Sequence, residues 1–578
     1  MPTVDVQFRI GGEAGQGLES SGAGFATALS RGGLHVFGIP SYYSRIRGGH
    51  NYFTVRASDE PVYAVRETIE LLLALNAETV ARHIDKLAPD GGIILDEGIA
   101  FDESLLEGRE VRLFRLPLMQ IAEEHGGAVM VNTAALAATA ALVGFDLEPI
   151  LSVIADNFGS KGEAVVAANR RVAEEAAAVA KERFGDAFPW KVPAREAPRR
   201  LVIGANDAFA MGALIGGCKF VAGYPMTPAT SVLQYMAAHA ARWGLVVKHA
   251  EDEIAAVNMC VGAAHAGARA MAPTSGGGFD LMVEGLSLAA MTETPLVIYL
   301  AQRPGPATGL ATRTAQADLF LALYSSHGEY PRVVLAPHTP AEAFACGWRA
   351  FNIAEKYQCV VIVLSDQYNA SSVWSVDPAE MDPRSVTIER GKLLSLPEIE
   401  ALDSYKRYLL TEDGISPRAL PGASPKAVYL ATGNEHREDG HITEEPEIAS
   451  AMVAKRLRKL AAASSEIRPP FHYGPAEAEI TFVSWGSTFG PLYEAITRLN
   501  AEGRSANLVH FVDLWPFPIE AAKGALSGAQ RLIAVEGNAT AQFASLLYAQ
   551  TGIRVDAKIL KYDGRGFTPE YILARVNP

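Results

Sequence analysis

Short apolar runs alternate with helix-length segments along most of the chain, and this alternation predicts the fold class. Between residues 218 and 303 the apolar runs are CKFVAGY, LVVKHAE, RAMAPTS and PLVIYLA, each ending in a turn rich in Gly, Pro, Ser or Thr. Strands spaced by helices are typical of βαβ units with a parallel sheet. In such sheets the loops that follow the strands build the binding site. We therefore expect an α/β fold with a site in this region.

The same alternation continues on both sides. The N-terminal part predicts strands in VDVQFRIGG, IELLLALN, GGIILDEG and VRLFRLP, and a long amphipathic helix at residues 161–183. The C-terminal part predicts strands in AEITFVSWGS, NLVHFVDLWPFP and RLIAVEGN. We also expect a helix in TAQADLFLALYSS, residues 314–326. The expected fold is three α/β units with largely parallel sheets.

Composition shifts mark the expected domain boundaries. The stretch DAFPWKVPAREAPRR has prolines at 189, 193 and 198, mixed charges and no periodicity, which is typical of a linker. We place the linker at 189–199. The domains expected around it are 1–188, 200–370 and 476–578, with an irregular connecting region at 371–475.

Charge and hydropathy exclude several classes of protein. The net charge of −14 argues against nucleic-acid binding, which needs a basic face. No apolar run reaches the roughly 18 residues that a membrane-spanning helix requires. The first residues, MPTVDVQFRIGG, lack the basic-then-apolar layout of a secretion signal. We therefore expect a cytoplasmic protein with no membrane association.

The cysteines predict no metal centre in this chain. Cys218, Cys260, Cys346 and Cys359 form no CxxC pair, and their spacing fits no zinc or iron–sulfur ligand set. We expect them to be small core residues in a reducing compartment.

Three loops between residues 218 and 303 carry polar side chains suited to chemistry: Thr227, Glu253 and Arg303. Glu253 ends the triplet EDE and opens the apolar helix IAAVNMCVGAAHAGA. Acids are common at a helix N-terminus because the helix dipole favours them. Alternatively, Glu253 is a carboxyl group pressed against apolar neighbours, which can share a proton with a ring nitrogen. The residues alone leave both interpretations open.

The motifs GYPMTPAT, EDEIAA, TSGGG and QRPGPATG, in that order, resemble the pyrimidine-binding domain of the 2-oxoacid:ferredoxin oxidoreductases, which are thiamine-diphosphate enzymes. The resemblance implies that Glu253 contacts the aminopyrimidine of the cofactor, together with Tyr224 and Pro225 of the first loop. It also implies that Thr227 and Arg303 hold the carboxylate of the substrate.

A second resemblance covers the N-terminal region. The turn GGEAGQG followed by SRIRGGHNYFTVR resembles the gamma-type subunit of the same family, which folds over the active site and helps to contain coenzyme A. It implies coenzyme A contacts for Gly15, Gln16, Gly17, Arg45 and Arg47. Without the resemblance, tight packing of a strand–turn–helix unit and two solvated arginines explain the same residues.

What the chain lacks defines its expected partners. Thiamine enzymes commonly bind the diphosphate and Mg²⁺ through an Asp-Gly-Asp loop, and the tripeptide at 439–441 is Asp-Gly-His instead. The resemblance therefore implies a beta subunit that carries the diphosphate site, Mg²⁺ and a [4Fe–4S] cluster, an alpha2beta2 heterotetramer, and ferredoxin as electron acceptor. The SWGS and VEGN motifs resemble the C-terminal domain of transketolase-like enzymes, mainly a support domain. Glu536 and Asn538 of VEGN have either a structural or a functional role there.

The reaction implied is the oxidative decarboxylation of a 2-oxoacid with coenzyme A, giving acyl-CoA, CO₂ and reduced ferredoxin. The fusion of gamma-type and alpha-type domains favours 2-oxoglutarate as substrate. Arg313 is a candidate for its distal carboxylate, or else a helix-flanking surface charge. The alternatives are the same chemistry on pyruvate or a branched-chain 2-oxoacid, a non-oxidative thiamine-diphosphate enzyme, and a non-catalytic assembly subunit.

Overall fold

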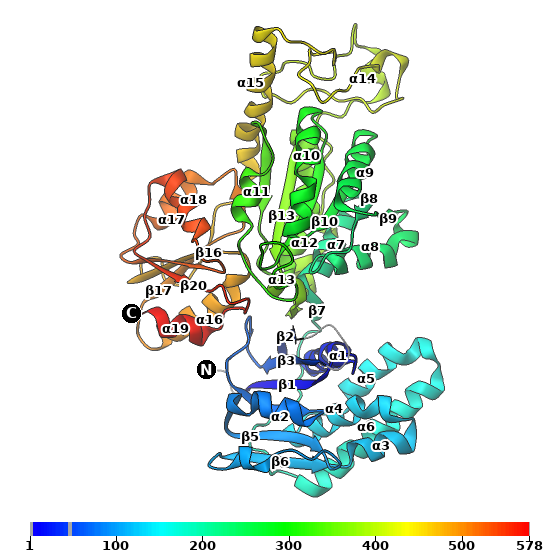
Figure 1. Ribbon diagram of the computed structural model, residues 1–578, viewed down its shortest axis with the longest axis vertical. Helices are drawn as coiled ribbons and strands as arrows, with labels where there is room; N and C mark the ends of the chain where they lie inside the picture. The colour runs from blue at the N-terminus through cyan, green and yellow to red at the C-terminus, as the bar shows by residue number, and fades with distance from the viewer. Residues whose placement is uncertain (1–3, 44–48, 577–578) are drawn as a thin grey trace. The chain divides into compact units, whose positions relative to one another are not determined.

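The computed structural model of the chain describes residues 4–43 and 49–576 (Figure 1). The chain forms two compact units. The first takes in the chain up to Ile203, together with Ser371–Pro378 and a C-terminal stretch that begins at Thr568. The second comprises Gly204–Ala370 and Ala379–Phe567.

The first unit is built on an eight-stranded mixed sheet with the order β6-β5-β4-β1-β3-β2-β14-β7. Strands β1, β4, β5 and β6 run parallel, whereas β3 pairs antiparallel with β1 and β2. The strands are β1 (Asp5–Glu13), β2 (His35–Tyr42), β3 (His50–Ser58), β4 (Ile69–Ala74), β5 (Leu87–Asp96), β6 (Val111–Leu116), β7 (Leu201–Gly204) and β14 (Val373–Val376).

Alanine-rich helices pack closely in this unit. The long helix predicted at 161–183 is present as α6, and its buried face includes Ala168, Ala173, Ala176 and Ala180, which lie against α4. Small side chains let the two helices approach closely, so this face serves packing. The helices are α1 (Leu18–Arg31), α2 (Ala77–His83), α3 (Leu118–His125), α4 (Val131–Val143), α5 (Glu148–Phe158), α6 (Glu163–Phe184) and α19 (Pro569–Val576).

The second unit contains a seven-stranded sheet with the order β18-β12-β13-β11-β10-β8-β9, parallel except for β18. Every residue of β11 and β13 is buried, as expected for parallel strands covered on both faces. The strands are β8 (Cys218–Gly223), β9 (Val246–His249), β10 (Arg269–Thr274), β11 (Leu296–Gln302), β12 (Arg332–Leu335), β13 (Val360–Asp366) and β18 (Asp513–Trp515). The helices are α7 (Ala205–Ile215), α8 (Thr230–Trp243), α9 (Glu253–His265), α10 (Gly276–Met291), α11 (Leu319–Tyr324), α12 (Pro340–Tyr357) and α13 (Gln367–Ser371).

A five-stranded sheet, β15-β17-β16-β19-β20, completes the second unit. The run NLVHFVDLWPFP, expected as one strand, is divided: after β17 the chain passes Val512 and pairs as β18 with β12 of the seven-stranded sheet. The two sheets share one hydrophobic core that includes Leu319, Trp485, Phe511 and Phe543. The elements are β15 (Phe471–Tyr473), β16 (Ile480–Trp485), β17 (Ala506–Phe511), β19 (Leu532–Glu536), β20 (Ala557–Leu560), α16 (Phe489–Ala501), α17 (Ile519–Leu526) and α18 (Gln542–Thr551).

In the sequence between β14 and β15, the α-helices are α14 (Leu396–Glu400) and the longer α15 (Pro446–Ala463). Helix α15 is anchored by buried charges. Lys455 Nζ lies 2.5 Å from Glu293 Oε1, and Lys459 pairs with the same carboxylate. Arg407 donates to the Glu293 carbonyl oxygen over 2.7 Å. One buried carboxylate therefore balances two buried lysines, with the guanidinium of Arg407 beside it.

The expected fold class is confirmed: three α/β sheets, largely parallel, are present. The helix expected at 314–326 is wrong in its first turns, because helical structure begins only at Leu319. The domain boundaries stay predictions. Within the described ranges, no helix is long and apolar enough to cross a bilayer.

Candidate active site

The loops that follow β8, β10 and β11 lie at the same edge of the seven-stranded sheet, because these parallel strands are neighbours in it. Thr227 follows β8, the glycine triplet 276–278 follows β10, and Arg303 follows β11. Arg303 Nη1 donates to the carbonyl oxygen of Thr227 over 2.9 Å, which joins the first and last of these loops. The structure thus brings Thr227 and Arg303 together, as the motif order predicts.

Glu253 is buried at the beginning of α9. Its neighbour Asp252 caps the helix by accepting a hydrogen bond from the Ala255 amide over 2.7 Å. Glu253 itself is only 3% exposed, and its Oε1 has no hydrogen-bond partner among the described residues. Buried carboxylate oxygens without a partner are rare in native proteins, since each costs the desolvation of that group. The capping role therefore belongs to Asp252, and Glu253 has an oxygen available for a ligand.

The glycine triplet at the start of α10 makes room for this carboxyl group. A Cβ on Gly278 would stand 2.6 Å from Glu253 Oε1 and 2.2 Å from Thr274 Oγ1, which is closer than atoms can approach. The position therefore requires glycine if Glu253 is to keep its place. The side-chain oxygen of Ser275, which precedes the triplet, is also buried without a hydrogen-bond partner in the described structure.

A second acid, Asp318, lies on the other side of the triplet. A Cβ on Gly276 would stand 2.5 Å from Asp318 Oδ2. This oxygen is buried, and no hydrogen-bond partner for it is found in the described part of the chain. Burial and the nearby Asp280 raise the pKa of Asp318, Arg303 lowers it, and the result is a pKa of about 6. Sequence reasoning missed this residue, because it lies in a segment expected to be helical.

The segment that carries Asp318 is fixed through Gln316 to residues at the ends of β16 and β19. Gln316 Nε2 donates to the Trp485 carbonyl oxygen over 2.8 Å, and Gln316 Oε1 accepts from the Gly537 amide over 2.8 Å. Asn538 Nδ2 donates to the Gln316 carbonyl oxygen over 3.0 Å. These contacts satisfy polar groups that a helix would otherwise pair, which explains why residues 314–318 are not helical. The SWGS and VEGN motifs therefore support the loop after β11.

Glu536 of VEGN has a structural position. Its carboxylate accepts hydrogen bonds from the Phe543 amide over 2.8 Å and the Ala544 amide over 2.9 Å, and so binds the first turn of α18. Burial raises its pKa, and these hydrogen bonds act in the opposite direction. Its two oxygens are thus engaged within the sheet, in agreement with the structural alternative.

The remaining residues predicted for this site differ in exposure. Tyr224 and Pro225 are exposed, and the Tyr224 ring centroid lies 6.2 Å from that of His249. Arg313 is only 9% exposed, and α11 begins six residues later. The surface-charge interpretation of Arg313 is therefore wrong, and the arginine is a buried cation of the loop after β11.

In the first unit, the glycine-rich turn closes on itself. Gln16 Oε1 accepts from the Glu13 amide over 2.7 Å, and Asn132 Nδ2 donates to the Gln16 carbonyl oxygen over 2.6 Å. Gly17 has φ 72°, in the left-handed region that glycine adopts readily. Arg45 and Arg47 lie outside the described residues. Two oxygens of the exposed Gln16 are thus engaged within the turn, and the coenzyme A contacts of Gly15, Gln16 and Gly17 stay predictions.

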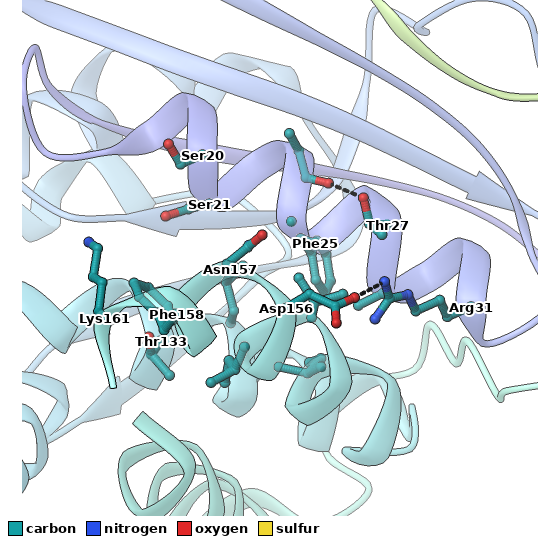
Figure 2. Close-up of a pocket in the computed structure, with 17 residues that line it drawn as sticks. Ser20, Ser21, Phe25, Thr27, Arg31, Thr133, Asp156, Asn157, Phe158 and Lys161 are labelled. Carbon is teal, nitrogen blue, oxygen red and sulfur yellow. Dashed lines mark hydrogen bonds and ion pairs between the residues drawn. The ribbon is translucent and has the colours of Figure 1, made fainter. Parts of the chain in front are cut away.

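The same unit has a cavity of about 650 Å³ between α1, α4 and α5 (Figure 2). Its lining includes the Arg31–Asp156 ion pair at one end and Lys161 beside Phe158 at the other. The residues that line it do not include those of the glycine turn from Gly15 to Gly17. The cavity and the turn are therefore separate features of this unit.

In the part of the chain that the structure describes, the cysteines and other potential metal ligands do not cluster. All four cysteines are free and buried, and burial raises the thiol pKa of each. No group of three or more His, Cys, Asp or Glu that is suited to a metal ion occurs within residues 4–43 and 49–576.

Comparison with known proteins decides the family. The model for pyruvate flavodoxin/ferredoxin oxidoreductase, thiamine diphosphate-binding, matches residues 211–455, and that for pyruvate ferredoxin/flavodoxin oxidoreductase matches residues 7–179. The alpha subunit of 2-oxoacid:ferredoxin oxidoreductase 2 of Aeropyrum pernix is 35% identical over 97% of this chain and 96% of its own length. The chain belongs to the 2-oxoacid:ferredoxin oxidoreductase family. The resemblance drawn from the sequence motifs is thereby confirmed, as is the class of enzyme.

Two further relatives are named for 2-oxoglutarate. The 2-oxoglutarate synthase subunit KorA of Methanothermobacter thermautotrophicus is 33% identical over 64% of this chain and 96% of its own length. The solved 2-oxoglutarate:ferredoxin oxidoreductase from Magnetococcus marinus, with 2-oxoglutarate, coenzyme A and succinyl-CoA bound, matches with a TM-score of 0.91. It is 35% identical, and the match covers 99% of each chain.

Proposed function

We propose that this chain is the alpha subunit, with a fused gamma-type region, of a 2-oxoglutarate:ferredoxin oxidoreductase. The reaction joins 2-oxoglutarate to coenzyme A with loss of CO₂, and passes two electrons one at a time to ferredoxin. Two kinds of observation support 2-oxoglutarate as the substrate. The Magnetococcus relative was solved with this diacid bound. The chain also places two arginines, Arg303 and Arg313, in the loop after β11.

The observation that carries the proposal is the unpartnered Oε1 of Glu253 beside the glycine triplet. This arrangement fits the aminopyrimidine of thiamine diphosphate, since a buried carboxyl group can exchange a proton with a ring nitrogen only if its oxygen is otherwise free. Gly278 leaves the space that the Glu253 carboxyl group occupies, because a Cβ there would stand 2.6 Å from Glu253 Oε1. Tyr224 and Pro225, which are exposed on the first loop, are the further pyrimidine contacts proposed.

Thiamine diphosphate, when bound, supplies a carbon nucleophile for the ketone and takes up the electron pair released with CO₂. The chain's own residues position and neutralise the reactants. Glu253 holds the proton at the pyrimidine nitrogen. Arg303, oriented by its hydrogen bond to the Thr227 carbonyl oxygen, binds the carboxylate that departs, and the Thr227 side chain assists. Arg313 is the proposed cation for the distal carboxylate of a diacid.

A beta subunit completes the proposed enzyme. It would carry the diphosphate and Mg²⁺ site, which the Asp-Gly-His tripeptide at 439–441 does not supply, and the [4Fe–4S] cluster, for which the four cysteines are unsuited. We propose an alpha2beta2 assembly with ferredoxin as the acceptor. Coenzyme A would be contained by the gamma-type region, with Gly15, Gln16, Gly17, Arg45 and Arg47 as candidate contacts.

The test replaces Glu253 with Gln in the assembled complex and measures exchange of the cofactor's thiazolium C2 proton for deuterium. Glu253→Gln retains the size of the side chain and removes the shared proton, so exchange and kcat should both fall by at least about 100-fold. Glu251→Gln is the matched control, because Glu251 belongs to the same acidic triplet and is exposed. Near-normal exchange in Glu253→Gln would refute the assignment.

A further inference from the structure

Asp318 has a defined position that the proposed function does not use. Its amide donates to Gln302 Oε1 over 2.9 Å, and the Gln542 side chain binds both flanks, donating to the Ala317 carbonyl oxygen over 2.8 Å and accepting from the Phe320 amide over 3.0 Å. The backbone is thus held on both sides. Its Oδ2 rests against Gly276, buried and without a hydrogen-bond partner among the described residues. An acid built in this way is unusual unless a ligand satisfies it.

Charged groups of both signs act on Asp318. Asp280 faces it from α10 and Arg303 from the loop after β11, while Glu253 on α9 lies across the glycine triplet. The end of β11 and α18 contribute the neutral amides of Gln302 and Gln542. Burial and Asp280 favour the neutral acid, and Arg303 favours the carboxylate, which gives a pKa of about 6. The negative charge of a carboxylate bound in direct contact would shift the balance further, so that the acid in the complex stays neutral at pH 8.

We propose that Asp318 is a second ligand of the substrate's reacting carboxylate, which it binds as a neutral acid after taking up a proton. This rests on the proposed function, in which Arg303 is the first ligand of that carboxylate. An ionised Asp318 would repel the bound anion and compete with it for Arg303. A protonated Asp318 instead donates its O–H to the anion, and the unpartnered position becomes satisfied.

Over one complete reaction Asp318 takes up one proton and gives it back. Asp318 takes one proton from solvent when the anionic substrate binds. The carboxylate then leaves as neutral CO₂, which removes the negative charge that favoured the neutral acid. Asp318 returns its proton to solvent, so no other reagent is required. As a ligand of the substrate, Asp318 makes substrate binding, rather than cofactor activation, dependent on pH.

The experiment measures binding without turnover. The assembled complex, loaded with thiamine diphosphate and Mg²⁺, is titrated calorimetrically with 2-hydroxyglutarate, which lacks the reactive ketone. Buffers of different ionisation heat give the number of protons taken up. Wild type should take up close to one proton per site near pH 8, and its Kd should rise about tenfold per pH unit above pH 7. In Asp318→Asn the amide donates without titrating, so Kd should no longer depend on pH and the uptake should vanish.

Two controls separate this role from a structural one. Asp280→Asn removes the repulsion that favours the neutral acid, so proton uptake should persist but begin its decline at lower pH. Arg303→Ala should weaken binding at every pH. If 2-hydroxyglutarate does not bind, kcat/KM for 2-oxoglutarate is measured over the same pH range.

The proposal is overturned if wild type takes up no proton near pH 8, if Asp318→Asn keeps the wild-type pH dependence, or if the fallback kcat/KM profile is flat. Failure of the proposed function would appear elsewhere, as absent C2 exchange in the wild-type complex. A complex that exchanges normally but shows no proton uptake therefore refutes only the role of Asp318.

Discussion

Gly278 lies so close to Glu253 that a Cβ on the glycine would stand 2.8 Å from the glutamate Cγ and 2.6 Å from its Oε1. The position of the buried carboxyl group thus depends on a missing side chain in a different helix. Glycine inside a helix normally costs about 1 kcal/mol relative to alanine. At position 278 the glycine leaves the space that the Glu253 side chain occupies, and the proposed cofactor site needs that side chain in place.

Replacing Gly278 with Ala should therefore displace Glu253. We expect C2 exchange and kcat to fall by at least about 10-fold, because the added methyl group would meet both Glu253 and Thr274 Oγ1. The complex should still assemble. Gly277→Ala is the matched control, since its nearest neighbour would be the Ala307 carbonyl oxygen at 3.9 Å. That variant should retain activity and gain up to about 1 kcal/mol of helix stability. Equal activity in the two variants would contradict this account.

The two arginines of the loop after β11 should have different effects on substrate choice. Arg303→Ala removes the charge-assisted partner of the carboxylate common to all 2-oxoacids, a loss of roughly 2–4 kcal/mol for every substrate. Arg313→Ala should lower kcat/KM for 2-oxoglutarate and spare pyruvate and 2-oxobutyrate. The measurement is the ratio of these specificity constants in each variant, with thermal unfolding as a check because Arg313 is buried. An unchanged ratio in Arg313→Ala would leave diacid preference to the partner subunit.

Asp318 should also make the stability of the chain depend on pH. Its pKa of about 6 in the folded chain exceeds the roughly 3.9 expected in the unfolded chain. Stability contributed by the neutral acid is therefore lost as pH rises through about 6. Asp318→Asn should raise the free energy of unfolding at pH 8 by on the order of 1–2 kcal/mol, after allowance for partial solvent screening, and by about half as much at pH 5, because the loss begins near the unfolded pKa. Denaturant titrations at both pH values test this, and an equal loss at each would show a purely structural role.

The buried cluster at α15 should be sensitive to its single carboxylate. Glu293→Gln leaves Lys455, Lys459 and Arg407 without a balancing charge, so we expect a destabilisation of about 3–5 kcal/mol. Burial already lowers the pKa of Lys455 to about 7, and Glu293 opposes that shift. Glu520→Gln breaks an exposed pair with Lys523 and should change stability by less than about 1 kcal/mol. Denaturant unfolding gives the free energy of unfolding of both variants. A similar small change in each would show that the cluster contributes little to stability.

The sequence was sufficient for the sheets and for the order of the motif loops, because apolar runs and turn residues determine both locally. It was also sufficient to single out Glu253, since an acid that opens an apolar helix is a local pattern. Asp318 and the burial of Arg313 were not predictable in this way. The position of Asp318 depends on Gln316 being held by Trp485 and Gly537, some 170 to 220 residues later in the chain, and Arg313 lies against Gly564, which is also distant in sequence. Hydrophobic periodicity carries no information about such distant polar contacts.

The passage of the chain from β17 to β18 has a consequence for how this polypeptide can be divided. Directly after β17 of the five-stranded sheet, the chain forms β18, which pairs with β12 at the edge of the seven-stranded sheet. A gene interrupted near codon 476 would leave that edge open to pairing with another chain. It would also remove the partners of Gln316. The C-terminal region is therefore not a detachable module, and complementation by a separately expressed fragment would require two sheets to be repaired at once.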